Sequence, residues 1–330
     1  MDENTLLPFD LPAVHRKKIT AAFDGGRISS DGGVMLLAQA DRRLGIAERL
    51  ARAIPDGRDP DRVTHLLPDI LRARIFAIAC GYEDADDLDR LRFDPAFKLA
   101  CGRLPDTGRD LCSQPTVSRL ENAPDLRDLI RLMGVMVDLY CASYTMPPEA
   151  VTLDIDDTVD VVHGHQQLSL FNAHYDERCF LPIHVYDTAT SRPVAVLLRP
   201  GKTPSGTEIR AHLRRLIRRL RHHWPQTRIT IRGDGHYGRP EVMQWCDENN
   251  IEFVFGLPGN PVLDRLVDET ADDIRTRRAL DQKPCLRGFA ETSYRAKSWN
   301  TDRRVCARIE ATTKGLDIRF LVTSIETGSA

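Results

Sequence analysis

The segment VTLDIDDT, residues 151–158, is the most informative stretch of this chain, because an alternating β-branched and apolar run leads into three aspartates. A second segment, ITIRGDGHYG at 229–238, follows the same plan and places Asp234 between two glycines. Such runs predict strands, and a strand end is stiff enough to hold carboxylates while one side stays open. Carboxylate oxygens are the ligands that Mg²⁺ and Mn²⁺ prefer. The two segments therefore predict a divalent metal site at the ends of two strands.

The positions of the aspartates along the first segment narrow this prediction. Side chains alternate faces along a strand, so Asp154 and Asp156 are expected on one face and Asp157 on the other. Two carboxylates on one face of a core strand repel each other unless a cation lies between them, and a metal ion meets that need. The alternative is that Asp154 pairs with an arginine while Asp157 and Thr158 cap a turn. Asp234 has its own alternative, a plain Asp-Gly turn.

The order of predicted elements indicates the fold. Three strands are expected at 151–156, 179–186 and 193–198, and the elements that follow are a helix at 207–223, a strand at 228–232, a helix at 239–249 and a strand at 252–256. This is the order of an α/β fold with a ribonuclease-H-like mixed sheet, whose first three strands are antiparallel. In that topology the ends of the first and fourth strands are adjacent, which favours one metal site for both segments. No Gly-x-Gly-x-x-Gly follows the first strand, so a dinucleotide-binding fold is not indicated.

The regions on either side of this core have different patterns. Apolar residues recur every three or four positions at 62–80 and 125–144, so residues 1–147 are expected to form a mostly helical domain. Two prolines mark the boundary with the core at 148–256. After Leu257 we expect a polar stretch without a helix, and then a β-rich insertion that occupies 257–330. Its alternating segments are 288–299, 303–312 and 316–324.

Length and composition exclude several classes of protein. The 330 residues are 42% hydrophobic, enough for one large or two ordinary domains. No run reaches the roughly 18 uncharged apolar residues of a membrane span, and no signal peptide is recognisable. We therefore expect a cytoplasmic protein without a membrane partner. The eight cysteines form no Cys-x-x-Cys pair, and no Gly-x-Ser-x-Gly occurs, which argues against a zinc finger and a serine nucleophile.

Basic residues are concentrated between the two aspartate segments, although the net charge is only −2. From Ile209 to Gly233 there are eight arginines and three histidines without one Asp or Glu. In the helix expected at 207–223, Arg214 and Arg218 lie off the apolar stripe and are candidates for contacts with the phosphates of a polyanion. A solvated amphipathic helix is the alternative.

A second candidate contact with nucleic acid lies in the helical domain. The stretch SQPTVSR at 113–119 is similar to the turn and first residues of a recognition helix. Its small hydroxyls, amide and guanidinium could reach phosphates or base edges, and the residues concerned are Gln114, Thr116, Ser118 and Arg119. A capped surface helix beginning near Ser113 explains the same residues without nucleic acid.

Taken together, these residues resemble the DDE transposases of bacterial insertion sequences, in particular the insertion-sequence thirteen-eighty family. The resemblance runs over nearly the whole chain and rests on the number and order of short motifs. These are Ser30-Asp31-Gly32-Gly33, Gly81-Tyr82-Glu83-Asp84, Gln114-Pro115-Thr116 with Ser118-Arg119 and Glu121-Asn122, Leu153-Asp154-Ile155-Asp156 with Thr158, His163-Gly164, Phe171-Asn172, Leu181-Pro182, Leu198-Arg199-Pro200-Gly201, Trp224-Pro225, Arg232-Gly233-Asp234 and Arg319-Phe320.

The resemblance implies a ribonuclease-H-like catalytic core behind a helical N-terminal DNA-binding region. It implies a protein that binds terminal inverted repeats as double-stranded DNA, cuts the element free and joins its 3′ ends to target DNA. Chemistry at paired ends is compatible with a homodimer on DNA, although the sequence leaves the oligomeric state open. Three acids of the family hold two Mg²⁺ or Mn²⁺ ions. The first falls on Asp156, in the pattern Asp-x-Thr, and the second on Asp234. Because Asp157 replaces a small residue, the resemblance leaves open whether Asp154 also contacts metal.

The third acid of the family is a Glu in a Tyr-x-x-Arg-x-x-x-Glu context, on a helix after the insertion. None is expected in this chain, which stops at Ala330 after the strand that precedes that helix, and Glu291 and Glu310 fall in β segments. The expectation is a truncated transposase that binds DNA but has weak or no strand cleavage. Two alternatives stay open: a non-catalytic DNA-binding fragment that inhibits the full-length enzyme, and a ribonuclease-H-like nuclease.

Overall fold

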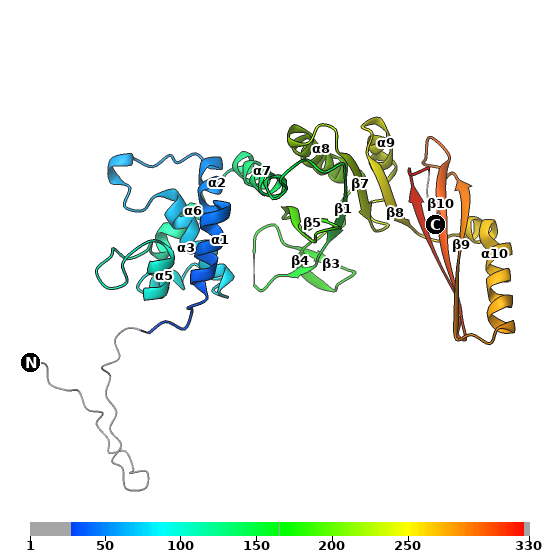
Figure 1. Ribbon diagram of the computed structural model, residues 1–330, viewed down its shortest axis with the longest axis horizontal. Helices are drawn as coiled ribbons and strands as arrows, with labels where there is room; N and C mark the ends of the chain where they lie inside the picture. Colours follow the sequence, from blue (N-terminus) through cyan, green and yellow to red (C-terminus); the bar gives the residue numbers. More distant parts are fainter. Residues whose placement is uncertain (1–27, 165, 327–330) are drawn as a thin grey trace, which may run out of the picture. The chain divides into compact units, whose positions relative to one another are not determined.

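The computed structural model describes residues 28–164 and 166–326, which divide into two compact units between Leu132 and Met133. The described part of the first unit consists of helices and loops, and the second combines two sheets with helices (Figure 1). The division falls inside one helix, α7 (Leu126–Ala142).

The first unit packs short helices around a small apolar core. The longest described helix that lies wholly in this unit is α3 (Leu67–Ala79). Its buried residues lie on one face, because they recur at helical spacing. They are Leu67, Ile70, Ala73, Phe76 and Ala77. The elements of this unit before α7 are α1 (Val34–Leu44), α2 (Ile46–Ala53), the 3₁₀ turn η1 (Pro60–Arg62), α3 (Leu67–Ala79), α4 (Leu88–Leu91), α5 (Pro95–Ala100) and α6 (Gln114–Glu121).

The helix α7 belongs to both units. Its buried residues Val137, Tyr140 and Cys141 are part of the core of the second unit. The division therefore lies ahead of the boundary at 147/148 that the sequence predicts. The two prolines of that boundary lie between α7 and the first strand, where the helical pattern has already ended.

An eight-stranded mixed sheet organises the second unit, in the order β6-β5-β1-β7-β8-β11-β10-β9. The central strand β1 pairs antiparallel with β5 and parallel with β7; β8 is parallel to β7, and β6 is antiparallel to β5. The prediction of a ribonuclease-H-like mixed sheet is confirmed. The elements are β1 (Ala150–Asp157), β5 (Ile183–Asp187), β6 (Pro193–Leu197), α8 (Gly206–His223), β7 (Arg228–Gly233), α9 (Pro240–Glu248) and β8 (Glu252–Leu257).

The core of this unit lies between one face of the sheet and its helices. Val151, Leu153 and Ile155 of β1 are buried with Ile209 and Leu213 of α8 in one cluster. Each such side chain contributes about 1.5–3 kcal/mol when removed from water. The start of α8 is defined by a capping box, in which Ser205 Oγ accepts from the backbone of Glu208 and the Glu208 carboxylate accepts from the backbone of Ser205.

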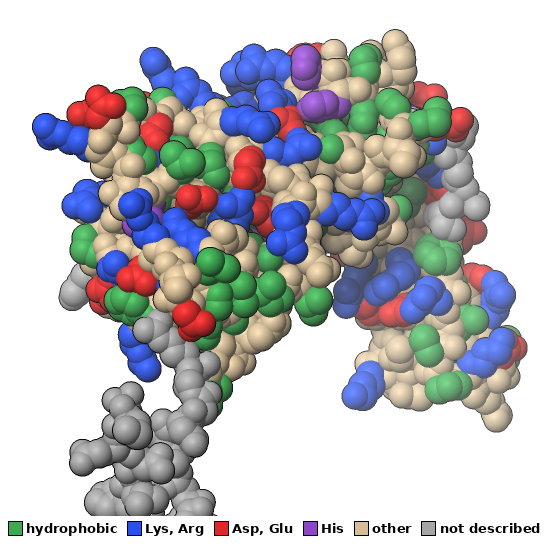
Figure 2. Space-filling model, turned by 60° about the vertical axis from the view of Figure 1, so that its left-hand side comes forward, with side chains coloured by type: hydrophobic (Ala, Val, Ile, Leu, Met, Phe, Trp, Pro, Cys, Tyr) green, Lys and Arg blue, Asp and Glu red, His purple; other side chains and the backbone are tan. Residues whose placement is uncertain are grey.

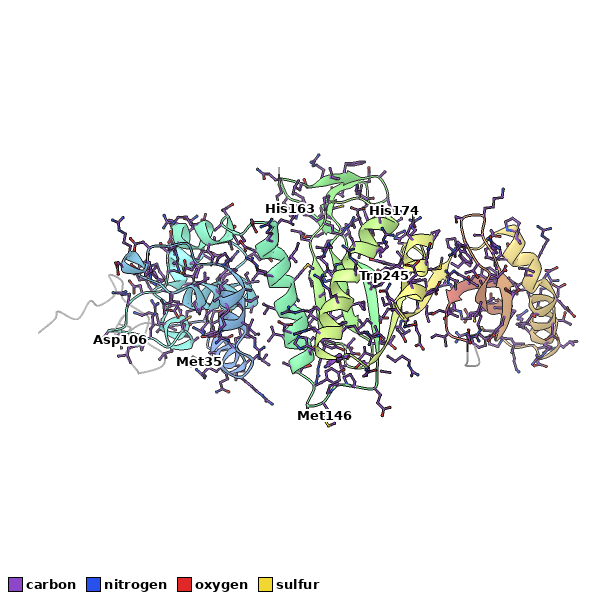
Figure 3. All side chains as sticks on the ribbon, turned by 90° about the horizontal axis from the view of Figure 1, so that it is seen from above. Met35, Asp106, Met146, His163, His174 and Trp245 are labelled. Atoms are coloured by element: carbon purple, nitrogen blue, oxygen red, sulfur yellow. The ribbon has the colours of Figure 1, made fainter. Side chains whose placement is uncertain are left out.

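The single strand predicted at 179–186 is wrong, because the structure divides it. The first part, β4 (Glu177–Phe180), belongs to a separate small sheet with β2 (Asp160–Val161) and β3 (Leu170–Asn172), and only the second part is β5. Pro182 lies at the break and lacks an N–H for a ladder. Its carbonyl accepts from the Thr158 N–H. His163 and His174, from two loops of the small sheet, lie at the same side of the unit in Figure 3.

The absence of a helix after Leu257 is a second wrong prediction. The helix α10 spans Pro261–Leu280, and Asn260 Oδ1 caps it by accepting from two backbone N–H groups. Its sequence is rich in charged residues, so its composition does not suggest a packed helix. The apolar residues nevertheless recur at ordinary helical spacing. Those that are buried are Leu263, Val267, Ala271 and Ile274.

The predicted β-rich segment follows α10 as an antiparallel meander. Its strands are β9 (Cys285–Tyr294), β10 (Arg303–Thr312) and β11 (Gly315–Thr323). Because β11 pairs with β8, the meander extends the main sheet. The β-rich segment is thus continuous with the core by backbone hydrogen bonds.

The surface carries both signs of charge. Lys and Arg side chains are prominent on the face shown in Figure 2, interspersed with Asp and Glu. Three of the exposed large apolar side chains, Leu36, Leu126 and Leu280, are on different helices. Among residues 28–164 and 166–326, no helix has the length and apolar character needed to cross a membrane.

Candidate functional site

Asp156 and Asp234 lie at the same edge of the main sheet. The last pair that joins β1 to β7 is Ile155 with Gly233, and each aspartate is the next residue of its chain. Because the two strands are parallel, both chains leave the paired region in the same direction. The strand order therefore places two carboxylates side by side at the ends of neighbouring strands.

The side chains of β1 alternate as the sequence predicts. Leu153 and Ile155 face the core and are almost completely buried. Asp154 and Asp156 take the opposite face, where Asp154 is half-buried and Asp156 is exposed. Asp157 returns to the core side and is half-buried. Only the face away from the core thus offers open carboxylates.

Asp154 is paired with an arginine. Arg232 Nε and Nη2 donate to its two carboxylate oxygens at 2.5 and 2.6 Å, and the two residues are direct partners in the β1–β7 register. The side chains are 34% and 52% exposed, so solvent limits the contribution of this pair to about 1 kcal/mol. The structure thus shows the arginine pairing that the sequence left open for Asp154.

Asp156 and Asp234 are engaged differently. Asp156 Oδ1 accepts from the Asp157 N–H at 2.9 Å, and Asp234 Oδ1 accepts from the His236 N–H at 2.8 Å. The second oxygen of Asp234 is 3.6 Å from His236 Nδ1. In the described part of the chain, neither carboxylate forms an ion pair with Arg or Lys. Both retain oxygen lone pairs that a hard cation can use.

Asp156, Asp157 and Asp234 are close enough to affect the pKa values of their neighbours. Burial raises the pKa of Asp157, and the carboxylates of Asp234 and Asp156 raise it further. The pKa of Tyr237, which is completely buried, is raised by burial first and then by the same three aspartates. The Tyr237 hydroxyl donates toward Asp157 Oδ1 at 3.5 Å. The buried Tyr237 is thus in contact with Asp157, on the core side of the strand end.

The turn that carries Asp234 is held by close backbone packing. A Cβ added to Gly256 of β8 would lie 2.8 Å from the Gly235 nitrogen and 3.2 Å from the Asp234 carbonyl carbon. Only glycine permits this approach of β8 to the turn. The position of Asp234 therefore depends on a strand distant from it in sequence.

The two glutamates considered in relation to the third acid lie in the meander. Glu310 accepts from Arg287 Nε at 2.6 Å and Glu291 accepts from Arg304 Nε at 3.0 Å, each across a strand pair. Within the residues that the structure describes, no three His, Cys, Asp or Glu side chains are grouped so as to hold a metal ion.

The helix predicted near Ser113 is α6, although the Ser113 side chain does not cap it. Gln114 Nε2 donates to Ser118 Oγ at 2.9 Å, so these two candidate DNA contacts are bonded to each other. Thr116 and Arg119 instead line a cavity of the first unit. The four candidates on this helix therefore divide into two pairs.

The basic helix α8 divides in the same way. Arg219 Nε donates to Asp138 of α7 at 2.6 Å, so part of the positive charge has a structural partner. Arg214 and Arg218 are exposed and, with Arg210, recur every four residues. No acidic partner of these three is present among the described residues. They form one basic stripe on the outer side of α8.

Comparison with known families matches residues 11–330 to the family described as Transposase DDE domain group 1. The chain belongs to this family of DDE transposases. Such transposases generally use divalent metal ions. This transposase also matches a solved structure titled "Crystal structure of the Mos1 Strand Transfer Complex", with 14% identity, 77% of this chain and 84% of that chain covered, and a TM-score of 0.23. That TM-score is too low to support a shared fold, and no curated protein matches the sequence.

Two features of the transposase are not among the site residues predicted from the sequence. Tyr237 lies three residues after Asp234, and an aromatic residue so close to a candidate metal ligand is a readable signal. The loop at 54–65 contains two arginines and a histidine, but nothing local places it against α6. The first feature could be predicted from the sequence, whereas the second required the packing of the helices.

Proposed function

We propose that this transposase cleaves and joins DNA strands at a divalent metal site formed by Asp156 and Asp234. The observation that supports it is the pair of carboxylates at one sheet edge, directly after the Ile155–Gly233 register pair and without an Arg or Lys partner in the described chain. Their oxygens suit Mg²⁺ or Mn²⁺. Two such ions are expected in the complete site.

Asp154 has a different part in this proposal. Its carboxylate is taken up by Arg232, which leaves Asp156 as the principal ligand on β1. We therefore treat Asp154 as a positioning residue that fixes the Arg232 guanidinium beside the metal site. That guanidinium is half-exposed and is available to a phosphate of the DNA.

The chemistry follows from these groups. Asp156 and Asp234 would hold the metal, and a divalent ion bound there would supply activation of the attacking oxygen and neutralisation of charge at phosphorus. The residues of the chain orient the site. The strand ends hold the two carboxylates, the Tyr237 hydroxyl contacts Asp157 of β1, and Gly256 allows β8 to pack closely against the Asp234 turn. No covalent bond between protein and DNA is required.

The proposed partner is double-stranded DNA, both the terminal inverted repeats and the target, bound by a homodimer in the bacterial cytoplasm. The exposed stripe of Arg214 and Arg218 on α8 supports contact with the phosphate backbone, because no acid neutralises it among the described residues. Thr116 and Arg119 of α6 supply contacts from the helical N-terminal region, with Gln114 and Ser118 beside them.

Replacing Arg214 and Arg218 together with glutamine is expected to weaken DNA binding about tenfold near physiological salt. Each lost phosphate contact also lowers the slope of log K against log salt by about 0.9. Fluorescence anisotropy over a range of salt concentrations measures both quantities. Arg277→Gln, on the exposed side of α10, is the matched control. A double variant with an unchanged salt slope would remove α8 from the DNA interface.

Strand cleavage by residues 1–330 is expected to be weak, because the Tyr-x-x-Arg-x-x-x-Glu pattern of the family does not occur in the sequence. The measurement is Mg²⁺-dependent excision of a substrate with matched inverted repeats. Efficient excision by this chain contradicts the expectation. Specific DNA binding without cleavage, unchanged in Asp156→Ala and Asp234→Ala, supports the inhibitory DNA-binding fragment. Preferential cleavage of RNA–DNA hybrids supports a ribonuclease-H-like nuclease.

A further inference from the structure

The first unit contains a cavity of about 660 Å³ between the loop that follows α2 and the helix α6. This volume falls within the roughly 300–1,000 Å³ of most ligand sites. Aliphatic side chains form part of its lining, among them Ile54, Val63 and Leu120. The polar residues that line it include Arg58, Arg62, His65, Thr116 and Arg119.

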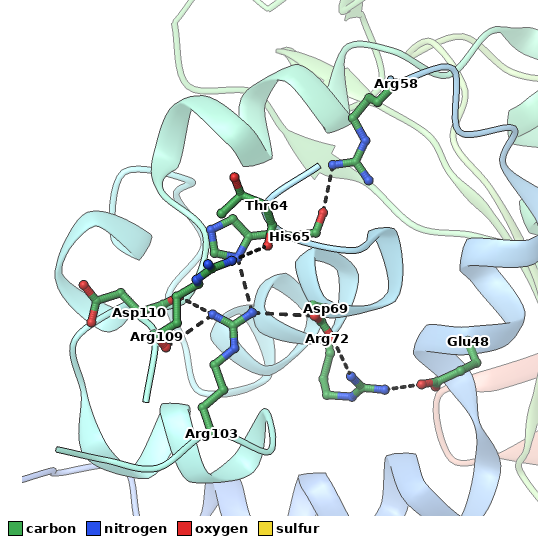
Figure 4. Close-up of polar contacts among 9 residues, drawn as sticks. All are labelled: Glu48, Arg58, Thr64, His65, Asp69, Arg72, Arg103, Arg109 and Asp110. Carbon is green, nitrogen blue, oxygen red and sulfur yellow. Dashed lines mark hydrogen bonds and ion pairs between the residues drawn. The ribbon is translucent and has the colours of Figure 1, made fainter. Parts of the chain in front are cut away.

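The loop that forms one wall is held by side-chain bonds. Arg58 makes a two-point contact with Asp56, with both nitrogen–oxygen distances at 2.7 Å. Its third nitrogen, Nη1, donates to the carbonyl oxygen of His65 at 3.0 Å. One guanidinium thus ties the two ends of the loop together, as Figure 4 shows for its contact with His65. The wall is therefore formed before any ligand binds.

Two further arginines reach the same loop from the segment after α5. Arg109 Nη1 donates to the Thr64 carbonyl at 3.2 Å, and Arg103 Nη2 lies 3.2 Å from His65 Nδ1 (Figure 4). A guanidinium has only donors, so His65 Nδ1 must accept this bond. The hydrogen of the neutral ring is then on Nε2, which becomes a free donor.

Arginines outnumber acids around this histidine, although Asp69 lies 3.6 Å from Arg103. The pKa of His65 is lowered, first by burial and then by Arg103, Arg109 and Arg92, while Asp69 opposes the shift. A lowered pKa favours the neutral ring at pH 7. The neutral ring offers a hydrogen-bond donor without adding a further charge.

The charges that line the cavity do not cancel. Its two lining acids are paired, because Asp56 contacts Arg58 and Asp59 lies 3.5 Å from Arg62, whereas Asp61 of the same loop is not a lining residue. Arg119 is exposed and has no side-chain partner among the described residues. The cavity thus combines apolar lining with an unneutralised guanidinium and several hydrogen-bonding groups.

This combination matches the chemistry of a nucleotide. A base has flat apolar faces and a polar edge, and its phosphate is an anion. A base inside a duplex cannot enter, because its faces are stacked and its edge is paired. We propose that the cavity binds one unpaired nucleotide of the DNA substrate, with its base against the apolar lining and its phosphate at Arg119.

This proposal rests on the proposed function in taking DNA as the partner, and the test separates the two. The full chain is titrated with two labelled duplexes of one sequence, fully paired or carrying one extrahelical nucleotide. The extrahelical duplex is expected to bind about tenfold tighter, which corresponds to about 1.4 kcal/mol. Fluorescence anisotropy gives both affinities at one salt concentration.

Two variants locate the preference in the cavity. Arg119→Gln removes the proposed phosphate contact on an exposed side chain, and Val63→Phe fills the cavity without changing charge. Each is expected to reduce the tenfold preference to about twofold or less, while Arg43→Gln, an exposed arginine of α1, keeps it. Equal loss of affinity for both duplexes in Arg119→Gln would assign this residue to the paired backbone and overturn the cavity proposal.

The remaining outcomes also discriminate. Equal binding of the two duplexes by the unaltered chain overturns the inference but leaves the proposed function standing. Absence of binding to either duplex overturns both. Free deoxyadenosine monophosphate is added as a competitor, and removal of the preference at low competitor concentration would show that the cavity serves a free nucleotide. Retention of the preference supports a nucleotide of the DNA strand.

Discussion

Asp156→Asn and Asp234→Asn are each expected to lower the affinity of the protein for Mn²⁺ at least tenfold, which is about 1.4 kcal/mol in binding free energy. Both are also expected to remove the weak Mg²⁺-dependent strand cleavage of this chain. The effect is large because each carboxylate is half of the pair at the sheet edge, and an amide keeps the shape but removes the charge that holds a divalent ion.

Metal affinity is measured by Mn²⁺ titration with electron paramagnetic resonance, so the test does not depend on cleavage. Asp160→Asn, an exposed aspartate of β2, is the matched control. Asp154→Asn is expected to change Mn²⁺ affinity less than twofold, since Arg232 already neutralises this carboxylate. A loss at Asp154 as large as that at Asp156 would make both residues of β1 metal ligands. Unchanged affinity in both principal variants would remove the proposed site.

Gly256→Ala is expected to destabilise the fold by about 2–3 kcal/mol, a shift of roughly 30- to 150-fold in the unfolding equilibrium. The added Cβ would lie 2.8 Å from the Gly235 nitrogen, so backbone rather than a flexible side chain must move. The same movement displaces Asp234. A loss of Mn²⁺ affinity is therefore expected although every acid is retained.

Gly259→Ala provides the control, because a Cβ there meets nothing closer than 3.6 Å. Urea unfolding of the two variants compares their stabilities, and Mn²⁺ titration of the folded proteins compares the site. A Gly256→Ala variant as stable as Gly259→Ala would mean that the turn moves freely. In that case the close approach of β8 does not set the position of Asp234.

Local sequence was sufficient for several strands and helices of the core. The strand β1, the helix α8 and the strand β7 occur within one or two residues of their predicted ranges, because alternation and helical periodicity follow from burial of one face. The order of these elements then predicts a ribonuclease-H-like sheet. That topology in turn predicts that Asp156 and Asp234 lie at one edge.

The wrong predictions have local causes. The apolar run at 179–186 conceals a chain that leaves one sheet and joins another at Pro182. The helix α10 was missed because its apolar stripe is narrow and its other positions are dense in Asp, Glu and Arg. In both segments the overall composition suggests the wrong element. The position of one proline decides the structure of the first, and a stripe of four apolar residues decides that of the second.

The candidate site shows which features local sequence cannot predict. The identity and spacing of the aspartates, and hence the kind of metal they suit, are properties of the chain itself and can be read without a fold. Which aspartate keeps a free carboxylate depends on the register of two strands, since Arg232 neutralises Asp154 only because it lies opposite on β7. The position of the Asp234 turn depends on its close packing against β8. The cavity beside α6 depends on the loop that precedes α3. Pairing and close approach between distant segments decide these features, because electrostatic neutralisation and packing act through space and carry no signal in the local sequence.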